Sequence, residues 1–190
     1  MIHPLTVNTK KLALVSALTA AAVGIQLCPR LPNVEFTSFV TFVVGVLSGS
    51  VAGVMSGVAV MAINGFWSPW GVAGINLPFQ AFGMALAGLV GGVYGRHMPN
   101  LGLKRFCMET SVLGASIALL FDLITNVGFA LYCMASGTPA AAAVVVAFVN
   151  GIIFTTVHVA SNTLIFGLFF IPLIKASSKY VAGGENTLVQ

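Results

Sequence analysis

Long apolar segments with almost no charged residues dominate this sequence. They lie at about 12–27, 36–64, 77–95, 108–133 and 140–174, separated by polar or Pro- and Gly-bearing stretches such as CPRLPNVE and RHMPNLGLKR. A helix rises about 1.5 Å per residue, so about 20 apolar residues cross the ~30 Å hydrocarbon core of a bilayer. Only 6% of the residues are charged, whereas soluble domains carry roughly a quarter. The sequence therefore predicts an all-α membrane protein that forms a single domain over residues 1–190.

The segment 36–64 is too long for one upright helix, because its 29 residues would extend about 44 Å. Ser48-Gly49-Ser50 lies near its middle and offers a turn, which divides it into helices at about 36–47 and 50–64. Lys and Arg concentrate in cytoplasmic loops. With this division most basic residues share one side of the membrane, namely Lys10, Lys11, Arg96, Lys104, Arg105, Lys175 and Lys179, and Arg30 falls outside. We therefore expect a bundle of six transmembrane helices with cytoplasmic N- and C-termini.

Small residues recur at every fourth position on several predicted helices. They are Ala13, Ala17 and Ala21 on the first helix, Gly45, Gly49, Gly53 and Gly57 on the second and third, and Gly83, Ala87, Gly91 and Gly95 on the fourth. Such faces let helix backbones approach closely, which matters because lipid gives no hydrophobic drive for helix association. We expect the glycine faces to pack within the chain, whereas the alanine face serves either packing or a partner.

Two pairs of polar residues, each four positions apart, lie inside predicted helices. Asp122 and Asn126 share a face in FDLITNVGF, and His158 and Asn162 share one in TTVHVASNTLIF. A carboxylate within a bilayer is costly and points to function by default. Asp122 and His158 fall at similar depths, so we expect them to pair across two helices. The pair either fixes helix packing or lines a ligand site.

The loop after the third helix contains both tryptophans, Trp67 and Trp70, in the stretch NGFWSPWG. Indole rings favour the membrane interface, so these rings form either an aromatic belt or a lid that stacks on a planar ligand. Asn64, Asn76 and Gln80 flank the rings and offer hydrogen bonds. A mostly apolar pocket with a few placed polar groups is typical of a small-molecule site.

These features predict a ligand site in the outer half of the bundle, between residues 64–80 and the last two helices. Asp122 and His158 are expected to form its polar floor, with Glu35 and Arg30 at its rim. The predicted ligand-binding residues are Glu35, Asn64, Trp67, Trp70, Asn76, Gln80, Asp122, Asn126, Asn150 and His158.

Signatures of catalysis are absent from the sequence. It contains no GxxxxGK[ST] P-loop and no HExxH motif, and Cys28, Cys107 and Cys133 have no metal-ligand spacing. The net charge of +4 is small and dispersed, which argues against nucleic acid as a partner. We expect no catalytic residues, no metal site, no cofactor in this chain and no enzymatic activity.

The order of these features resembles the substrate-binding S component of energy-coupling factor (ECF) vitamin transporters. The stretch PRLPNVEFTSFVTFVVGVLSGSVAGVMSGVAVMAINGFWSPWG resembles the first half of such subunits, and FQAFGMALAGLVGGVYGR resembles their fourth helix, so the resemblance covers roughly residues 10–175. It implies a multi-pass protein of the prokaryotic plasma membrane that captures a vitamin or related micronutrient at the outer face. It further implies that a membrane scaffold subunit contacts Ala13, Ala17 and Ala21, and that two separate cytoplasmic ATPases power uptake.

The resemblance also implies a lid formed by the outer loops at 28–35, 64–80 and 134–139. PNVEF and FWSPWG resemble the cobalamin-type subfamily, and riboflavin, thiamine, a queuosine precursor or another small heterocycle are further candidates. Two other functions stay open. One is a stand-alone transporter that uses Asp122 and His158 as a proton relay. The other is an intramembrane enzyme that acts on a lipid or isoprenoid with the same two residues.

Overall fold

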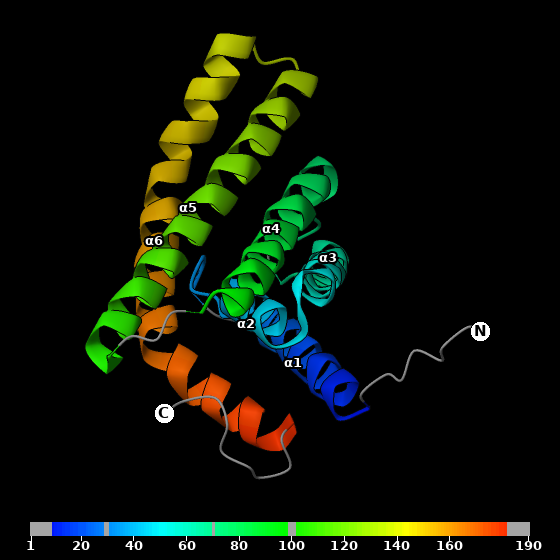
Figure 1. Cartoon of the computed structure of the whole chain (residues 1–190). Coiled ribbons are helices and arrows are strands. Elements are labelled where there is room, and N and C mark those ends of the chain that lie inside the picture. The colour runs from blue at the N-terminus through cyan, green and yellow to red at the C-terminus, as the bar shows by residue number, and fades with distance from the viewer. Residues whose placement is uncertain (1–8, 29–30, 70, 99–101, 182–190) are drawn as a thin grey trace, which may run out of the picture.

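The computed structural model describes residues 9–28, 31–69, 71–98 and 102–181, and this part of the chain is helical, without a β-strand. The elements are α1 (Thr9–Leu27), α2 (Thr37–Ser48), α3 (Ser50–Trp67), the short 3-10 helix η1 (Gly74–Asn76), α4 (Leu77–Arg96), α5 (Leu103–Ala135) and α6 (Ala140–Val181) (Figure 1). Five of these helices, α1, α3, α4, α5 and α6, are long and apolar enough to cross a membrane. This agrees with the prediction of an all-α, multi-pass membrane protein.

The remaining helix, α2, is short and lies inside the bundle. Its 12 residues extend about 18 Å, which is too little to cross a membrane alone. Gly49 ends α2 and leads directly into α3 with a φ of 90°, a conformation that glycine adopts without steric cost. Every residue from Thr37 to Gly45 is buried, as expected for a helix that other elements surround. The predicted break within residues 36–64 is therefore present at Gly49.

Glycines bring α2, α3 and α4 into backbone contact. A Cβ atom on Gly88 of α4 would overlap the backbone of Gly53 in α3, and one on Gly45 of α2 would overlap the carbonyl oxygen of Gly88. Close packing of this kind holds membrane helices together by van der Waals contact. The expectation that the glycine faces pack within the chain is confirmed.

Phenylalanine rings connect this unit to α6. The ring centroid of Phe166 lies 5.2 Å from those of Phe39 and Phe42 in α2, and Phe42 lies 5.8 Å from Phe170. These separations fall within the ~4.5–7 Å range in which aromatic pairs attract. On its other side α6 packs along α5, so α6 joins the α5–α6 hairpin to the rest of the bundle.

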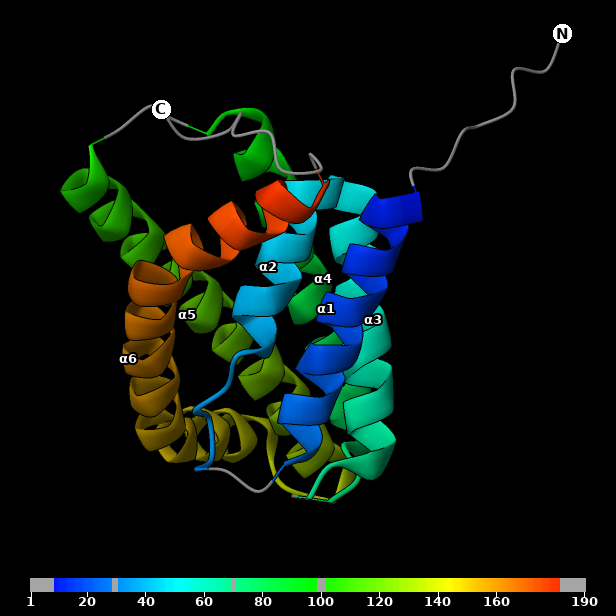
Figure 2. The ribbon, with the colours of Figure 1, turned by 90° about the horizontal axis from the view of Figure 1, so that it is seen from below.

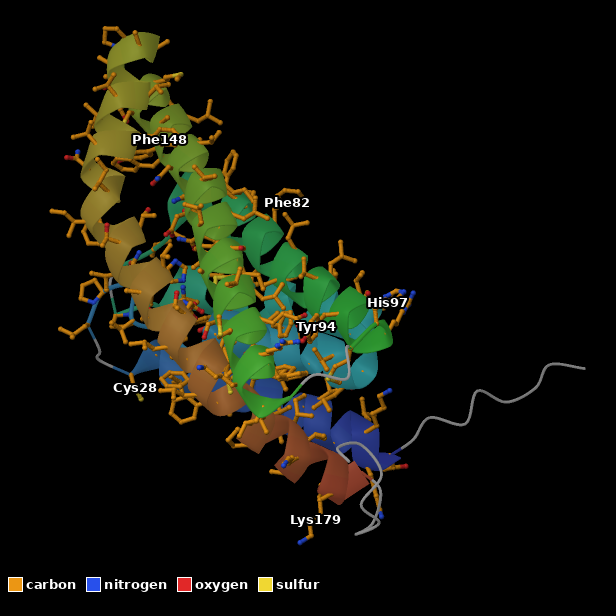
Figure 3. All side chains as sticks on the ribbon, turned by 60° about the vertical axis from the view of Figure 1, so that its left-hand side comes forward. Cys28, Phe82, Tyr94, His97, Phe148 and Lys179 are labelled. Atoms are coloured by element: carbon orange, nitrogen blue, oxygen red, sulfur yellow. The ribbon has the colours of Figure 1, made fainter. Side chains whose placement is uncertain are left out.

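The helix ends fall into two groups, which lie at the top and the bottom of the bundle in Figure 2. The start of α1, the end of α4, the start of α5 and the end of α6 lie at one end of the bundle, and the end of α3 and the α5–α6 turn lie at the other. We call the first the basic end, because it carries Lys10, Lys11, Arg96, Lys104, Arg105, Lys175 and Lys179. We call the second the loop end. In Figure 3 the side chain of Lys179 points away from the bundle at the basic end, far from Phe148.

Two helices extend furthest beyond the ranges expected from apolarity alone. α5 begins at Leu103 rather than near 108, and α6 continues to Val181 rather than ending near 174. The last part of α6 runs across the basic end, and Pro172, which removes one helical hydrogen bond, lies within this helix. Helical hydrogen bonding thus continues through polar residues at the edge of the apolar segments.

Candidate functional site: a buried polar cluster and its cavity

Three ionisable side chains from separate parts of the chain meet inside the bundle. They are Glu35 just before α2, Asp122 in α5 and His158 in α6. The Nδ1 atom of His158 lies 2.9 Å from Oδ1 of Asp122, and Nε2 lies 3.0 Å from Oε1 of Glu35. The three side chains are at most 8% exposed. We call them the polar cluster, and the predicted pairing of Asp122 with His158 is confirmed.

Glu35 lies within this cluster and not at the predicted rim. Its Oε2 atom accepts hydrogen bonds from the backbone N–H groups of Thr37 and Ser38, which are among the unpaired donors at the start of α2. A carboxylate at the rim would leave these amides without partners in an apolar interior, which is costly. The carboxylate also opposes the partial positive charge of the helix N-terminus. Arg30, expected beside Glu35, lies outside the described residues.

The hydrogen-bond network extends from the cluster to α1. Asn162, one turn after His158, uses Nδ2 to donate to Oε1 of Glu35 at 3.4 Å and to the carbonyl oxygen of His158 at 3.2 Å. Thr37 donates from Oγ1 to Oε1 of Gln26 in α1 at 2.8 Å. The network therefore ties α1, α2, α5 and α6 together at one depth of the bundle.

With one proton in each of its two imidazole–carboxylate hydrogen bonds, the polar cluster has a net charge of −1. Each of the two hydrogen bonds between the imidazole ring and a carboxylate needs one proton. Two protons shared among one imidazole and two carboxylates leave one negative charge, whether both stay on the ring or one moves to an oxygen. The second carboxylate oxygen of Asp122 is buried and has no hydrogen-bond partner among the described residues. A buried charge of this kind is expensive inside a membrane.

A cavity of about 670 Å³ lies against the cluster. Glu35 and His158 form part of its wall, and the other polar side chains there include Asn33, Asn64, Asn76 and Gln80. Aromatic side chains complete the lining, namely Phe121, Phe129, Tyr132 and Phe154. The volume and the mixture of aromatic walls with a few polar groups are typical of small-molecule sites, which enclose about 300–1,000 Å³.

Three amides in the cavity wall have side-chain oxygens without a hydrogen-bond partner in the described part of the chain. These are Asn64 near the end of α3, Asn76 in η1 and Gln80 in the first turn of α4. Nearly all buried polar groups in proteins are paired, and an unpaired one costs about 1–3 kcal/mol. The three side chains line the cavity, but these oxygen atoms are themselves enclosed by protein.

Half of the predicted ligand residues meet at this cavity. Its lining includes Glu35, Asn64, Asn76, Gln80 and His158. Asp122 is connected to the cavity through its hydrogen bond to His158. The predicted lid segments 28–35 and 64–80 both supply described lining residues, whereas 134–139 supplies none among them.

The remaining predicted residues do not converge there. Trp67 is 67% exposed and packs edge-on against Phe66, and Trp70 lies outside the described residues. Asn126 packs against Gly151 between α5 and α6, and Asn150 is exposed. Asn150 was predicted to join the site because of its depth alone. It lies eight residues before His158 in α6, and this spacing turns it about 80° away from the face that carries His158.

Sequence reasoning missed Asn33 and the aromatic part of the wall. Asn33 has a φ of 60°, donates from Nδ2 to the carbonyl oxygen of Phe154 at 3.2 Å, and accepts at its own carbonyl from Oγ of Ser161 at 3.1 Å. These bonds fix the segment before α2 on α6. The sequence feature that could have identified Asn33 is its position directly after Pro32, because Asn tolerates left-handed turn conformations.

The predicted partner face lies on the outside of the bundle. Ala13, Ala17 and Ala21 are exposed on α1, and a Cβ atom on Gly24, one turn further, would meet no atom within 4 Å. This face is therefore not used for packing between described helices. Among the described residues, no group of three or more His, Cys, Asp or Glu side chains is placed to hold a metal ion.

Comparison with known proteins adds no relative: no family model, no curated protein and no solved structure matches this sequence.

Proposed function

We propose that this protein is the substrate-binding membrane subunit of an ECF-type transporter, which captures a vitamin or related micronutrient at the outer face of the cell membrane. The observation that carries the proposal is the cavity of about 670 Å³, whose wall combines aromatic side chains with the amides of Asn64, Asn76 and Gln80. A cavity of this size and chemistry suits a small organic molecule. Several of its lining residues belong to the segments that join helices at the loop end, such as Asn33 and Val72.

The orientation in the membrane follows from charge. Cytoplasmic segments are enriched in Lys and Arg, so the basic end faces the cytoplasm and the loop end faces outward. Both termini are then cytoplasmic, and the helices run in alternating directions. The short α2 completes its crossing together with the segment that carries Asn33 and Glu35. The cavity opens toward the outer face in this arrangement.

The energy source is a separate set of subunits. The sequence has no P-loop, so ATP hydrolysis of that type takes place in other chains. The exposed face of Ala13, Ala17 and Ala21 supports a contact with a membrane scaffold, because small residues let two helices approach closely.

Copurification from the native membrane tests this assignment. A tagged full-length chain is expected to retain a membrane scaffold and two P-loop ATPases, identified by mass spectrometry. Ala17→Leu is expected to lose these partners, whereas Ala142→Leu, at an exposed alanine of α6, keeps them. A chain that supports uptake in proteoliposomes without ATP and without any other protein would contradict the proposal.

A second function is favoured by the polar cluster itself. Two buried carboxylates that share protons with His158 are the kind of group that relays protons in membrane transporters. A stand-alone proton-coupled transporter would accumulate its substrate when a proton gradient is imposed on proteoliposomes containing this chain alone. ATP-dependent uptake that requires the copurified subunits, and is insensitive to a protonophore, would exclude it.

A further inference from the structure

The last part of α6 differs from the rest of this helix in its direction. Pro172 lies within α6, and the helix bends before it runs across the basic end (Figure 2). Proline removes one helical hydrogen bond and its ring displaces the preceding turn, which makes it a common cause of such bends. We call residues 173–181 the α6 tail. The tail lies across the basic end and does not continue in the direction of the spanning part of α6.

The described side chains of the α6 tail divide between two faces. Ile174 and Ser177 are buried, and Ile174 belongs to the same hydrophobic core as Phe170, one turn earlier. Lys175 and Lys179, four positions apart, share the opposite face and are exposed. Figure 3 shows Lys179 pointing away from the bundle. One face therefore packs on the protein and the other is basic, which is typical of helices that lie at a membrane interface.

The surface of α6 beside the tail faces acyl chains. Leu168 and Phe169 are exposed although both are large and apolar, as expected in a helix that is long and apolar enough to span a membrane. Lys175 follows Leu168 by seven residues, which places the two on about the same side of a helix. Tyr180 is also exposed, and Tyr is enriched at the depth of the lipid headgroups. The α6 tail therefore begins where acyl chains give way to headgroups.

The charges at the basic end match an anionic surface. Seven Lys and Arg residues lie there, and Glu109 is the only acidic residue at that end in the described part of the chain. Neither Lys175 nor Lys179 forms an ion pair with a described carboxylate. Anionic lipids attract basic segments beside a membrane by about fivefold in affinity per charge.

A soluble anion fits this arrangement less well than a lipid does. Lys175 and Lys179 lie on the outer side of a helix and are not among the described residues of the cavity wall. Free phosphate would meet two exposed ammonium groups in water, where ion pairs contribute little. A phospholipid is already held in the bilayer by its acyl chains, so its phosphate reaches the lysines at a high effective concentration.

We propose that the α6 tail is an interfacial helix that binds anionic phospholipid. Lys175 and Lys179 contact the phosphate of the headgroup, and the acyl chains lie against Leu168 and Phe169. With the basic end facing the cytoplasm, these lipids belong to the inner leaflet. The inference depends neither on the small molecule in the cavity nor on an ECF partner.

Titration with defined lipids tests the proposal. The full-length chain, delipidated in mild detergent, is titrated with dioleoylphosphatidylglycerol or dioleoylphosphatidylcholine, and bound lipid is counted by native mass spectrometry. We expect the anionic lipid to bind at least tenfold more tightly, and inorganic phosphate to displace it no more than sodium chloride of the same ionic strength does. Equal affinity for the two lipids, or specific displacement by phosphate, would overturn the proposal.

Charge variants locate the lipid on the α6 tail. Lys175→Gln combined with Lys179→Gln is expected to weaken binding of phosphatidylglycerol roughly 25-fold, whereas the corresponding pair of Arg substitutions keeps the charge and stays within about twofold. Lys104→Gln combined with Arg105→Gln removes the same charge from the start of α5 and should weaken binding at most fivefold. All four side chains are exposed, so these variants are expected to fold. An equal loss in the two Gln pairs would show that the whole basic end, and not the tail, attracts the lipid.

Copurification distinguishes a lipid from a protein on the same surface. The chain with Lys175→Gln and Lys179→Gln is expected to keep the scaffold and ATPases that the unmodified chain retains. A variant that loses these proteins but binds phosphatidylglycerol normally would make the tail a protein contact and overturn the lipid assignment. Selective lipid binding by a chain that never retains an ATPase would refute the ECF assignment alone.

Discussion

Replacing His158 by leucine tests the polar cluster most severely. The substitution removes the imidazole that bridges Glu35 and Asp122 and leaves two buried carboxylates without it. Removing one partner of a buried ion pair costs about 3–5 kcal/mol. Glu35 keeps its bonds to the start of α2, so we expect the lower end of this range, about 3 kcal/mol. For a chain of this size that corresponds to a melting temperature about 6–12 °C lower.

Thermal unfolding in detergent, followed with a thiol-reactive dye, measures this loss. The dye reports on Cys107 and Cys133, which are partly buried, whereas Cys28 is exposed from the start. His97→Leu changes an exposed histidine at the end of α4 and is expected to melt within about 1 °C of the unmodified chain, because surface substitutions have small effects.

A triple variant separates charge from shape. Adding Glu35→Gln and Asp122→Asn to His158→Leu removes both stranded charges, so we expect at least half of the lost stability to return. Replacing a buried ionic cluster by neutral groups is often tolerated, whereas breaking it is not. The charge argument is refuted if His158→Leu melts like the unmodified chain, or if the triple variant is less stable than the single one.

Further predictions concern packing, the exposed tryptophan and orientation. Gly88→Ala should destabilise the chain by about 1–3 kcal/mol, because the new methyl overlaps the backbone of α3, and an unchanged melting temperature would contradict the close approach. Trp67→Ala should leave ligand affinity within about twofold, since the ring is 67% exposed outside the cavity lining, and a tenfold loss in calorimetry would place it in the site. In a cysteine-free background, Val72→Cys should react with an impermeant thiol reagent added outside intact cells and Gly102→Cys should not, with the reverse pattern rejecting the orientation.

The features of the fold that could be predicted from the sequence are those that depend on a single physical effect. Burial in lipid requires long apolar helices, so their existence follows from the lengths of the apolar segments. The break at Gly49 and the glycine contacts followed as well, because both depend on small residues at particular positions. The ends of α5 and α6 did not follow, since helical hydrogen bonds continue past the point where apolarity stops.

The sequence predicted how deep the site residues lie in the bundle, but not the direction in which their side chains point. Asp122 and His158 were paired correctly because both lie near the middle of neighbouring long helices. Glu35 lies 123 positions from His158 in sequence, and its place depends on how the segment before α2 folds onto α6, which local patterns do not determine. Asn150 was at a suitable depth but faces away from the cavity, because small errors in helix rotation move a side chain to another face.

Native mass spectrometry of the full-length chain, purified in mild detergent from its own membranes, tests most directly whether the cavity holds a small molecule. The account predicts one bound small molecule per chain in the unmodified chain and in Asn150→Leu, and a strongly reduced adduct in Asn64→Leu. Preparations that never contain an adduct, or an adduct equally abundant in Asn64→Leu, would contradict it.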